Sequence, residues 1–212
     1  MDKFSIYELM SFFFPGLLLV CMVAQFLPQG WLLFSDFPTF ATAVLVTIVA
    51  TVAGLALHRL TCLLIKYPWF CYFAKKPIGS IVKKNTEEIG NAFSALQRYN
   101  TDGLQAGELF DKAYHFLQQE GKLDSAISFQ SMYFFLRNIM TMCLLMLPIC
   151  GVLIAIDYKG LLALKTILFC TVLFILAQSA GFYRMKMVSR VFNTYLVVLE
   201  KENINKTTVH LP

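Results

Sequence analysis

The amino-acid sequence predicts an all-α fold: a polytopic membrane protein with four transmembrane helices and a small cytoplasmic helical bundle. Hydrophobic residues make up 58% of the 212 positions, and charged residues only 15%. Because soluble domains have about a quarter of their residues charged, this chain has too few charges to cover a globular surface. Aromatic residues reach 15%, with 20 Phe, which fits contact with lipid and anchoring at the membrane interfaces.

Four stretches without a formal charge each extend for about 18 residues or more, long enough to cross a hydrocarbon core as a helix. They predict spanning helices near residues 9–28, 39–64, 134–156 and 161–183. The chain then divides into an N-terminal amphipathic segment with the first transmembrane hairpin (1–66), a cytoplasmic helical insert (67–131), a second transmembrane hairpin (132–183) and a cytoplasmic C-terminal helix with its tail (184–212).

The distribution of Lys and Arg predicts the orientation of these helices. Of the 18 basic residues, only Lys159 and Lys165 fall in the two short loops on one side of the bilayer. Cytoplasmic loops of membrane proteins carry an excess of Lys and Arg. We therefore expect a multi-pass protein with both termini and the long central insert in the cytoplasm.

The first apolar run is interrupted by Pro15 and Gly16. A signal peptide would need a basic start and a small-x-small cleavage site, and the run has neither. Ser5 and Glu8 instead have the spacing of a capping box, which predicts a retained helix that starts near Ile6 and is kinked at Pro15. Such kinks are common in membrane helices, and they can also act as hinges. The hinge candidates are Pro15, Gly16, Pro148 and Gly151.

The cytoplasmic insert has the apolar spacing of amphipathic helices. One helix is expected from Ile78 to about Tyr99, followed by a turn at 99–103 and a second helix that ends at Gly121. A long helix capped near Asp124 should continue into the third span, and the fourth span should continue as an amphipathic C-terminal helix. These apolar stripes must be covered, so we expect them to pack into a bundle, within one chain or between subunits.

The sequence contains no recognisable catalytic motif. The three His residues are far apart, and the six Cys include no Cys-x-x-Cys pair. There is no Walker loop, dinucleotide-binding fingerprint or nucleophile elbow, and the spans lack the acidic residues that intramembrane chemistry or proton coupling would use. We expect neither an enzyme nor a metal site, and we expect no cofactor.

The second predicted helix carries a narrow stripe of small and polar residues, and the fourth repeats it more weakly. One interpretation is close helix packing, in which small residues let backbones approach and Thr bonds across the interface. The other is the lining of a pore formed by several copies of the chain. The pore-lining candidates are Thr47, Thr51, Gly54, His58, Thr171 and Gln178.

Basic residues gather near the predicted cytoplasmic ends of the spans. They suit contact with anionic lipid headgroups, and they also suit a cytoplasmic ligand that carries phosphate. The candidates for either role are Arg59, Lys66, Lys75, Lys76, Lys83, Lys84, Arg184, Lys186 and Arg190.

Three short segments carry a resemblance to a known class of proteins. They are Tyr7-Glu8-Leu9, Phe14-Pro15-Gly16 and the run from Phe129 to Arg137-Asn138. With the order of spans and insert, the chain resembles small four-span bacterial inner-membrane effectors of nucleotide-signalled anti-phage defence, with the Hailong-type membrane effector as one candidate. No site residue carries over from this resemblance.

The resemblance implies a homo-oligomeric channel in the bacterial inner membrane. A nucleotide or short oligonucleotide made by a partner nucleotidyltransferase would gate it, and no duplex nucleic acid is expected. The alternative is a non-conducting membrane anchor or scaffold that recruits a soluble partner through its cytoplasmic helices.

Overall fold

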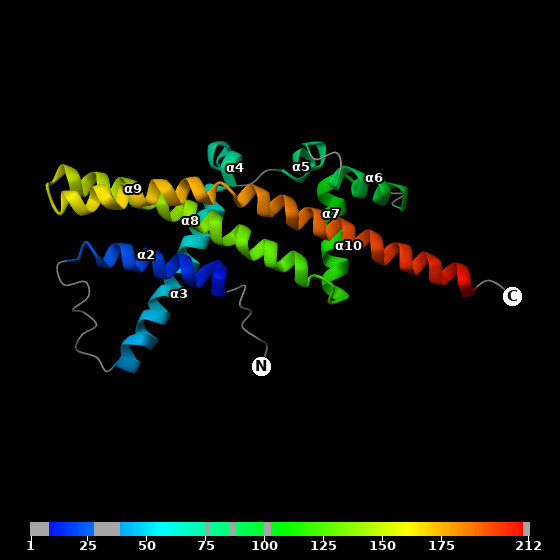
Figure 1. The fold of residues 1–212 in the computed structure, drawn as a ribbon, viewed down its shortest axis with the longest axis horizontal. Helices are drawn as coiled ribbons and strands as arrows, with labels where there is room; N and C mark the ends of the chain where they lie inside the picture. Colours follow the sequence, from blue (N-terminus) through cyan, green and yellow to red (C-terminus); the bar gives the residue numbers. More distant parts are fainter. Residues whose placement is uncertain (1–8, 28–38, 75–76, 85–87, 100–102, 210–212) are drawn as a thin grey trace. The chain divides into compact units, whose positions relative to one another are not determined.

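The computed structural model describes residues 9–27, 39–74, 77–84, 88–99 and 103–209, without the side chains of residues 39, 72–74, 84 and 202–209. All secondary structure in these ranges is helical, as Figure 1 shows, which confirms the all-α prediction. Three segments contain a helix long and apolar enough to cross a membrane: Phe40–Leu64, Asp124–Ala155 and Gly160–Lys201. The apolar helical segment Leu9–Ala24 is shorter than these three.

The chain divides into two compact units. The first unit comprises residues 1–74 and 131–180, and the second comprises residues 75–130 and 181–212. Each unit is therefore built from two separate segments of the sequence. One helix, α8 (Asp124–Ala155), begins in the second unit and ends in the first.

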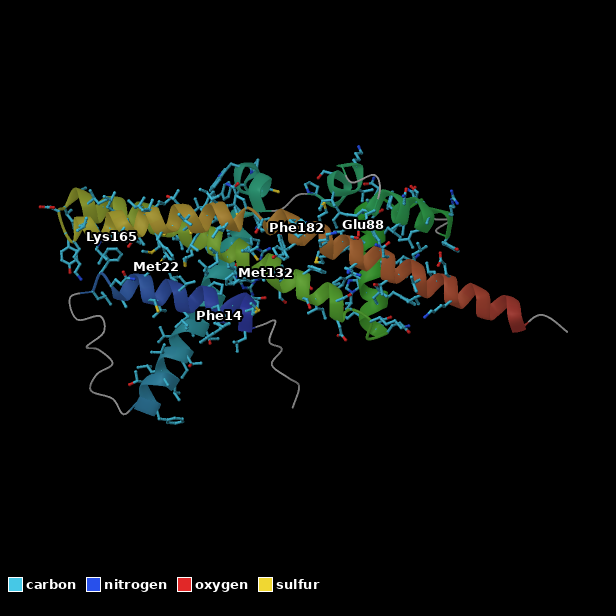
Figure 2. All side chains as sticks on the ribbon, in the orientation of Figure 1. Phe14, Met22, Glu88, Met132, Lys165 and Phe182 are labelled. Atoms are coloured by element: carbon cyan, nitrogen blue, oxygen red, sulfur yellow. The ribbon has the colours of Figure 1, made fainter. Side chains whose placement is uncertain are left out.

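The first unit contains the membrane-capable helices. Its elements are a π-helical turn η1 (Leu9–Phe13), α2 (Phe14–Ala24), α3 (Thr39–Leu64), α4 (Pro68–Ala74), most of α8, and α9 (Gly160–Ala177). Its buried apolar cluster joins Met22 of α2, which Figure 2 labels, to Leu57 of α3, to Met140 and Met146 of α8, and to Cys170 of α9.

Two glycines bring α2 and α3 into backbone contact. A Cβ atom added at Gly16 would overlap the carbonyl oxygen of Ala50, and one added at Gly54 would overlap the carbonyl oxygen of Phe12. Small residues allow this kind of close approach between membrane helices. The structure therefore places Gly16 at a packing contact with α3.

The turn between α8 and α9 is tied to the end of α2. The Tyr158 hydroxyl donates to the carbonyl oxygen of Phe26 at 3.1 Å, and Lys159 Nζ donates to that of Gln25 at 2.8 Å. A cation at the C-terminal end of a helix is favoured by the helix dipole. Lys159 thus stabilises the end of α2 opposite to η1.

The second unit has its own apolar core. Its elements are α5 (Ile78–Lys84), α6 (Ile89–Tyr99), α7 (Ala106–Gln119), the first turns of α8, and α10 (Ala180–Val209). Ile89, Leu96, Leu109, Leu117 and Phe192 are fully or almost fully buried in it. A contiguous core of this kind is what the amphipathic stripes of the insert and the C-terminal helix require.

Several helix bounds agree with the sequence predictions, and others differ. The predicted span 39–64 coincides with α3, and the long helix from Asp124 into the third span is confirmed as α8. The stop at Gly121 is confirmed by its positive φ of 65°. The helix expected from Ile78 to Tyr99 is divided into α5 and α6, and α4 was not predicted.

The first and fourth predicted spans are shorter in the structure. Pro15 follows the π-helical turn η1, and α2 ends at Ala24. Helix α9, which corresponds to the predicted span 161–183, ends at Ala177, because the chain makes a turn at Gln178 and Ser179 before α10 begins. The capping box expected at Ser5 and Glu8, with its helix start near Ile6, lies outside the described residues.

Candidate functional site

We call Thr47, Thr51, Gly54 and His58 the α3 stripe. Its N-terminal half consists of Thr47 and Thr51. Their hydroxyl groups donate to the carbonyl oxygens four residues earlier, those of Ala43 and Thr47, each at 2.8 Å. Thr47 is exposed and Thr51 is half-buried. On α9, Thr171 is exposed and donates in the same way to Ile167 at 2.9 Å, and Gln178 lies exposed just beyond the helix.

The C-terminal half of the α3 stripe, Gly54 and His58, is covered by other helices. Gly54 is buried beneath the backbone of Phe12. His58 lies half-buried between two rings, with centroid distances of 4.8 Å to Phe12 and 5.7 Å to Phe134. The four residues of the α3 stripe therefore do not share one exposed surface, because η1 and α8 cover its C-terminal half.

A buried polar cluster joins η1, α3 and α8 at this covered end. Thr61 of α3 donates its hydroxyl hydrogen to Leu57, and its oxygen lies 2.7 Å from that of Thr141 on α8. Asn138 donates to the carbonyl oxygen of Ser11 at 2.8 Å. Arg137 directly precedes Asn138 on α8, and its Nη2 lies 3.3 Å from Nδ1 of His58, one turn before Thr61 on α3. We call these six residues the Arg137 cluster: Ser11, His58, Thr61, Arg137, Asn138 and Thr141.

The predicted basic residues are spread over both units. Arg59 and Lys66 are exposed at the end of α3, and Lys83 is exposed on α5. Lys75, Lys76 and the side chain of Lys84 lie outside the described residues. On α10, Arg184 is buried, while Lys186 forms an ion pair with Glu88 at 3.3 Å.

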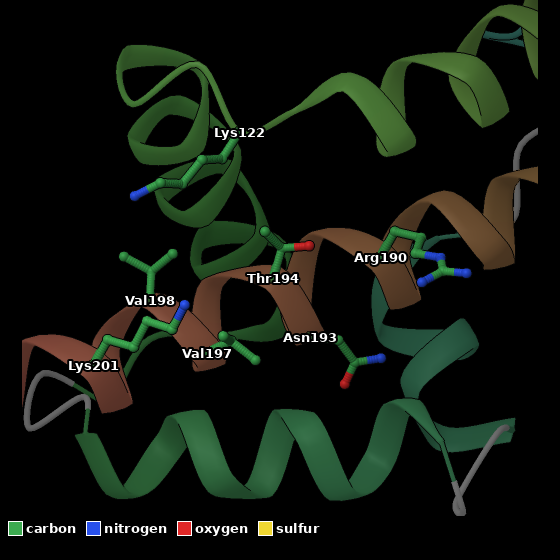
Figure 3. A pocket seen from close by; sticks show the side chains of 7 residues that line it. All are labelled: Lys122, Arg190, Asn193, Thr194, Val197, Val198 and Lys201. Carbon is green, nitrogen blue, oxygen red and sulfur yellow. The ribbon is translucent and has the colours of Figure 1, made fainter.

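Arg190 is the one predicted basic residue that lines a groove described by the structure. This groove has a volume of about 620 Å³ and lies in the second unit. We call it the α10 groove, and Figure 3 shows the side chains that line it: Lys122, Arg190, Asn193, Thr194, Val197, Val198 and Lys201.

The α10 groove presents positive charge together with uncharged polar groups. Six of the lining residues lie on one face of α10, and Lys122 approaches from the end of α7 (Figure 3). None of the described residues that line the groove is a carboxylate, although Glu120 accepts from Lys122 Nζ at 3.0 Å in an exposed pair. Exposed ion pairs contribute little stability, so an anionic ligand can replace Glu120 at small cost. The volume falls in the range of about 300–1,000 Å³ typical of small-molecule sites.

Sequence reasoning missed the residues that the structure gathers most closely. Arg137 and Asn138 were not among the predicted site residues, although a basic residue within a long apolar helix is itself a signal of function. Lys122 and Lys201 were missed because each stands apart from the denser basic runs. The sequence did contain a signal for this site: Arg190 and Lys201 are three helical turns apart, on one face of the predicted C-terminal helix.

The described residues contain no group of three or more His, Cys, Asp or Glu residues that could hold a metal ion. All six Cys residues are free thiols. Comparison of the chain with protein-family models, with curated proteins and with solved structures gives no match.

Proposed function

We propose that the chain forms an oligomeric channel in the bacterial inner membrane, opened by an anionic ligand that binds the α10 groove on the cytoplasmic side. The α10 groove carries this proposal, because its lining, in the part of the chain that the structure describes, contains three cationic side chains and no carboxylate. The ligand class that we propose is a nucleotide or short oligonucleotide, in which phosphate groups meet the cations while Asn193 and Thr194 hydrogen-bond the remainder.

The helix connectivity supports a link between the ligand and the membrane. Helix α10 forms one side of the groove and follows α9 after a turn of two residues, and α8 belongs to both units. A ligand that orders the second unit therefore acts on the ends of two apolar helices. We propose that α2, α3, α8 and α9 form four spans, with both termini and the second unit in the cytoplasm, as the Lys and Arg distribution predicts.

Binding and conduction should be measured on the same purified full chain in liposomes. Nucleoside triphosphates and short single-stranded oligonucleotides serve as probes, and ion flux reports opening. Changing Lys122 and Lys201 to Gln should weaken probe binding at least about tenfold, because each charged hydrogen bond contributes about 1.5–3 kcal/mol. The matched control is Arg98→Gln, an exposed basic residue of the same unit outside the groove. Unchanged binding in the double variant would exclude the groove.

A second test concerns the α3 stripe. Cys introduced at Thr47 and at Thr51, in a chain without native Cys, should react with water-soluble thiol reagents when the probe opens the channel. Thr51→Gly should alter conductance, whereas Val52→Gly, on an exposed apolar face, should mainly reduce stability. Unreactive cysteines in a conducting protein would place the conduction path elsewhere.

The second candidate function is a non-conducting anchor that recruits a soluble partner. The coverage of Gly54 by Phe12 favours it, because close backbone contact at a glycine suits helix packing. Probe binding without ion flux in the liposomes would support the anchor over the channel.

A further inference from the structure

Arg137 is a buried cation whose closest side-chain partners are uncharged. Arg137 as a whole residue is 6% exposed to solvent. Its Nη2 lies 3.3 Å from His58 Nδ1 and 3.9 Å from Cys62 Sγ. Because an arginine side chain only donates hydrogen bonds and keeps its charge in proteins, Nδ1 must act as the acceptor. His58 is then a neutral imidazole in this contact, and it leaves the charge of Arg137 unbalanced.

Aromatic rings stabilise this charge without neutralising it. The guanidinium carbon lies 4.8 Å from the ring centroid of Phe134 and 5.4 Å from that of Tyr133. Such contacts are attractive because of the ring quadrupole, but a ring has no net charge. The only carboxylate among the described residues of the first unit is Asp157, beyond the far end of α8. Twenty residues of helix separate two side chains by about 30 Å.

Two polar atoms of this cluster also lack hydrogen-bond partners. Arg137 Nε and Asn138 Oδ1 are both buried and have no partner among the described residues. A buried donor without a partner is unfavourable, and more so when the group is charged. The Nε–H and one Nη2–H together form the side of the guanidinium that binds oxyanions in a bidentate manner. Asn138, the next residue in the sequence, offers Oδ1 as an acceptor for a hydroxyl group of a ligand.

The cluster lies near the end of an apolar helix that is followed by basic and aromatic residues. His58 and Cys62 belong to the last two turns of α3, which ends at Leu64. Lys66, Tyr67 and Trp69 follow, and all three are exposed. Basic and aromatic residues at the end of an apolar helix mark the membrane–water interface. In the proposed four-span topology, the lipid headgroups are therefore within about ten residues of His58, on the order of 15 Å along a helix.

We propose that the Arg137 cluster is a binding site for a phosphate group, which supplies the counter-charge of Arg137. The phosphate comes either from the headgroup of an anionic lipid or from free phosphate, and the chemistry at Arg137 is the same for both. Its oxygens accept from Nε–H and Nη2–H, and a hydroxyl of a glycerol headgroup donates to Asn138 Oδ1. This site is separate from the α10 groove, and its existence does not depend on conduction.

The test measures thermal unfolding of the delipidated full chain in an uncharged detergent. One arm titrates inorganic phosphate, and the other transfers the protein into phosphatidylcholine bilayers with or without phosphatidylglycerol. We expect phosphate or phosphatidylglycerol to raise the Tm of the wild type. Arg137→Gln should lose this effect. The control Arg98→Gln removes an exposed arginine of the second unit and should keep it.

A second variant, Arg137→Lys, keeps the proposal testable if Arg137→Gln fails to fold. It keeps the charge but loses the bidentate side of the guanidinium, so the phosphate or lipid concentration that gives half of the stabilisation should rise about tenfold, as expected for one charge-assisted hydrogen bond. Stabilisation by inorganic phosphate identifies a free ligand, and stabilisation by phosphatidylglycerol alone identifies a headgroup. Either supports the site.

Two results would overturn the proposal. The first is a wild-type protein whose Tm responds to neither probe. The second involves Glu8, an acidic residue that lies outside the described residues. If Glu8→Gln destabilises the protein as much as Arg137→Gln, and the double variant no further, the counter-charge is a carboxylate of the chain itself.

Discussion

The contact between α2 and α3 makes a prediction about two glycines that differ only in their surroundings. Gly16 and Gly151 both lie inside predicted apolar spans and inside helices. A Cβ atom at Gly16 would overlap Ala50 and lie 2.9 Å from the Cα atom of Gly54. At Gly151, no described atom lies within 4 Å apart from the adjacent residues and the nearby backbone of α8 itself. The same substitution, Gly→Ala, should therefore have opposite effects at the two positions.

The expected magnitudes follow from these contacts. At Gly16 the obstructing atoms are backbone, which cannot rotate away, so α2 and α3 must separate. Overpacking of this kind destabilises by about 1–3 kcal/mol. At Gly151, the substitution removes backbone freedom from the unfolded chain and should stabilise by about 0.5–1 kcal/mol. For a protein of this length, 1 kcal/mol corresponds to a Tm change of about 2–4 °C.

Thermal unfolding in one detergent, followed by circular dichroism, measures both variants under the same conditions. Gly16→Ala should lower the Tm by about 2–12 °C, and Gly151→Ala should raise it by about 1–4 °C. Gly54→Ala should act like Gly16→Ala, because it meets the backbone of Phe12. A wild-type Tm in both Gly16→Ala and Gly54→Ala would refute the close approach of α2 and α3.

Two further predictions concern the core of the second unit and the Arg137 cluster. Phe192 is fully buried, with ring centroids 6.0 Å from Phe93 and 6.1 Å from Phe110. Phe192→Ala should destabilise the second unit by about 3–5 kcal/mol, and Phe192→Leu should destabilise it less. Urea unfolding measures both variants. Equal stability of the wild type and the two variants would contradict the burial of Phe192 in this core. Thr61 and Thr141 share a buried hydrogen bond at 2.7 Å, so a double-mutant cycle with Thr→Val at each position should give a coupling of about 0.6 kcal/mol. A coupling of zero would show that the two hydroxyl groups act independently.

Helix positions were predicted best where length and apolar character decide the structure. The bounds of α3 and the continuity of α8 followed from the sequence, because a long apolar segment satisfies its backbone hydrogen bonds in lipid by forming a helix. The breaks between α5 and α6 and between α9 and α10 were missed. Amphipathic spacing continues across both breaks, and the periodicity of side chains does not report where the backbone turns.

The candidate sites were predicted less well than the helices. The polar stripe of α3 was recognised, but not that η1 and α8 cover Gly54 and His58. Of the six predicted basic residues whose side chains the structure describes, only Arg190 lines the α10 groove. The grouping was made by proximity in the sequence. The groove combines residues from α10 with Lys122, which is 68 positions before Arg190.

The sequence by itself determined that this protein is helical and has segments suited to a membrane, because composition and the length of apolar runs are local properties. The tertiary structure alone decided which side chains meet. Arg137 reaches His58 across 79 positions, and Gly16 faces Gly54 across 38. Such pairs depend on the rotation and crossing of each helix relative to its neighbours, which are set by packing of all the contacting side chains together. A residue type at one position does not specify them.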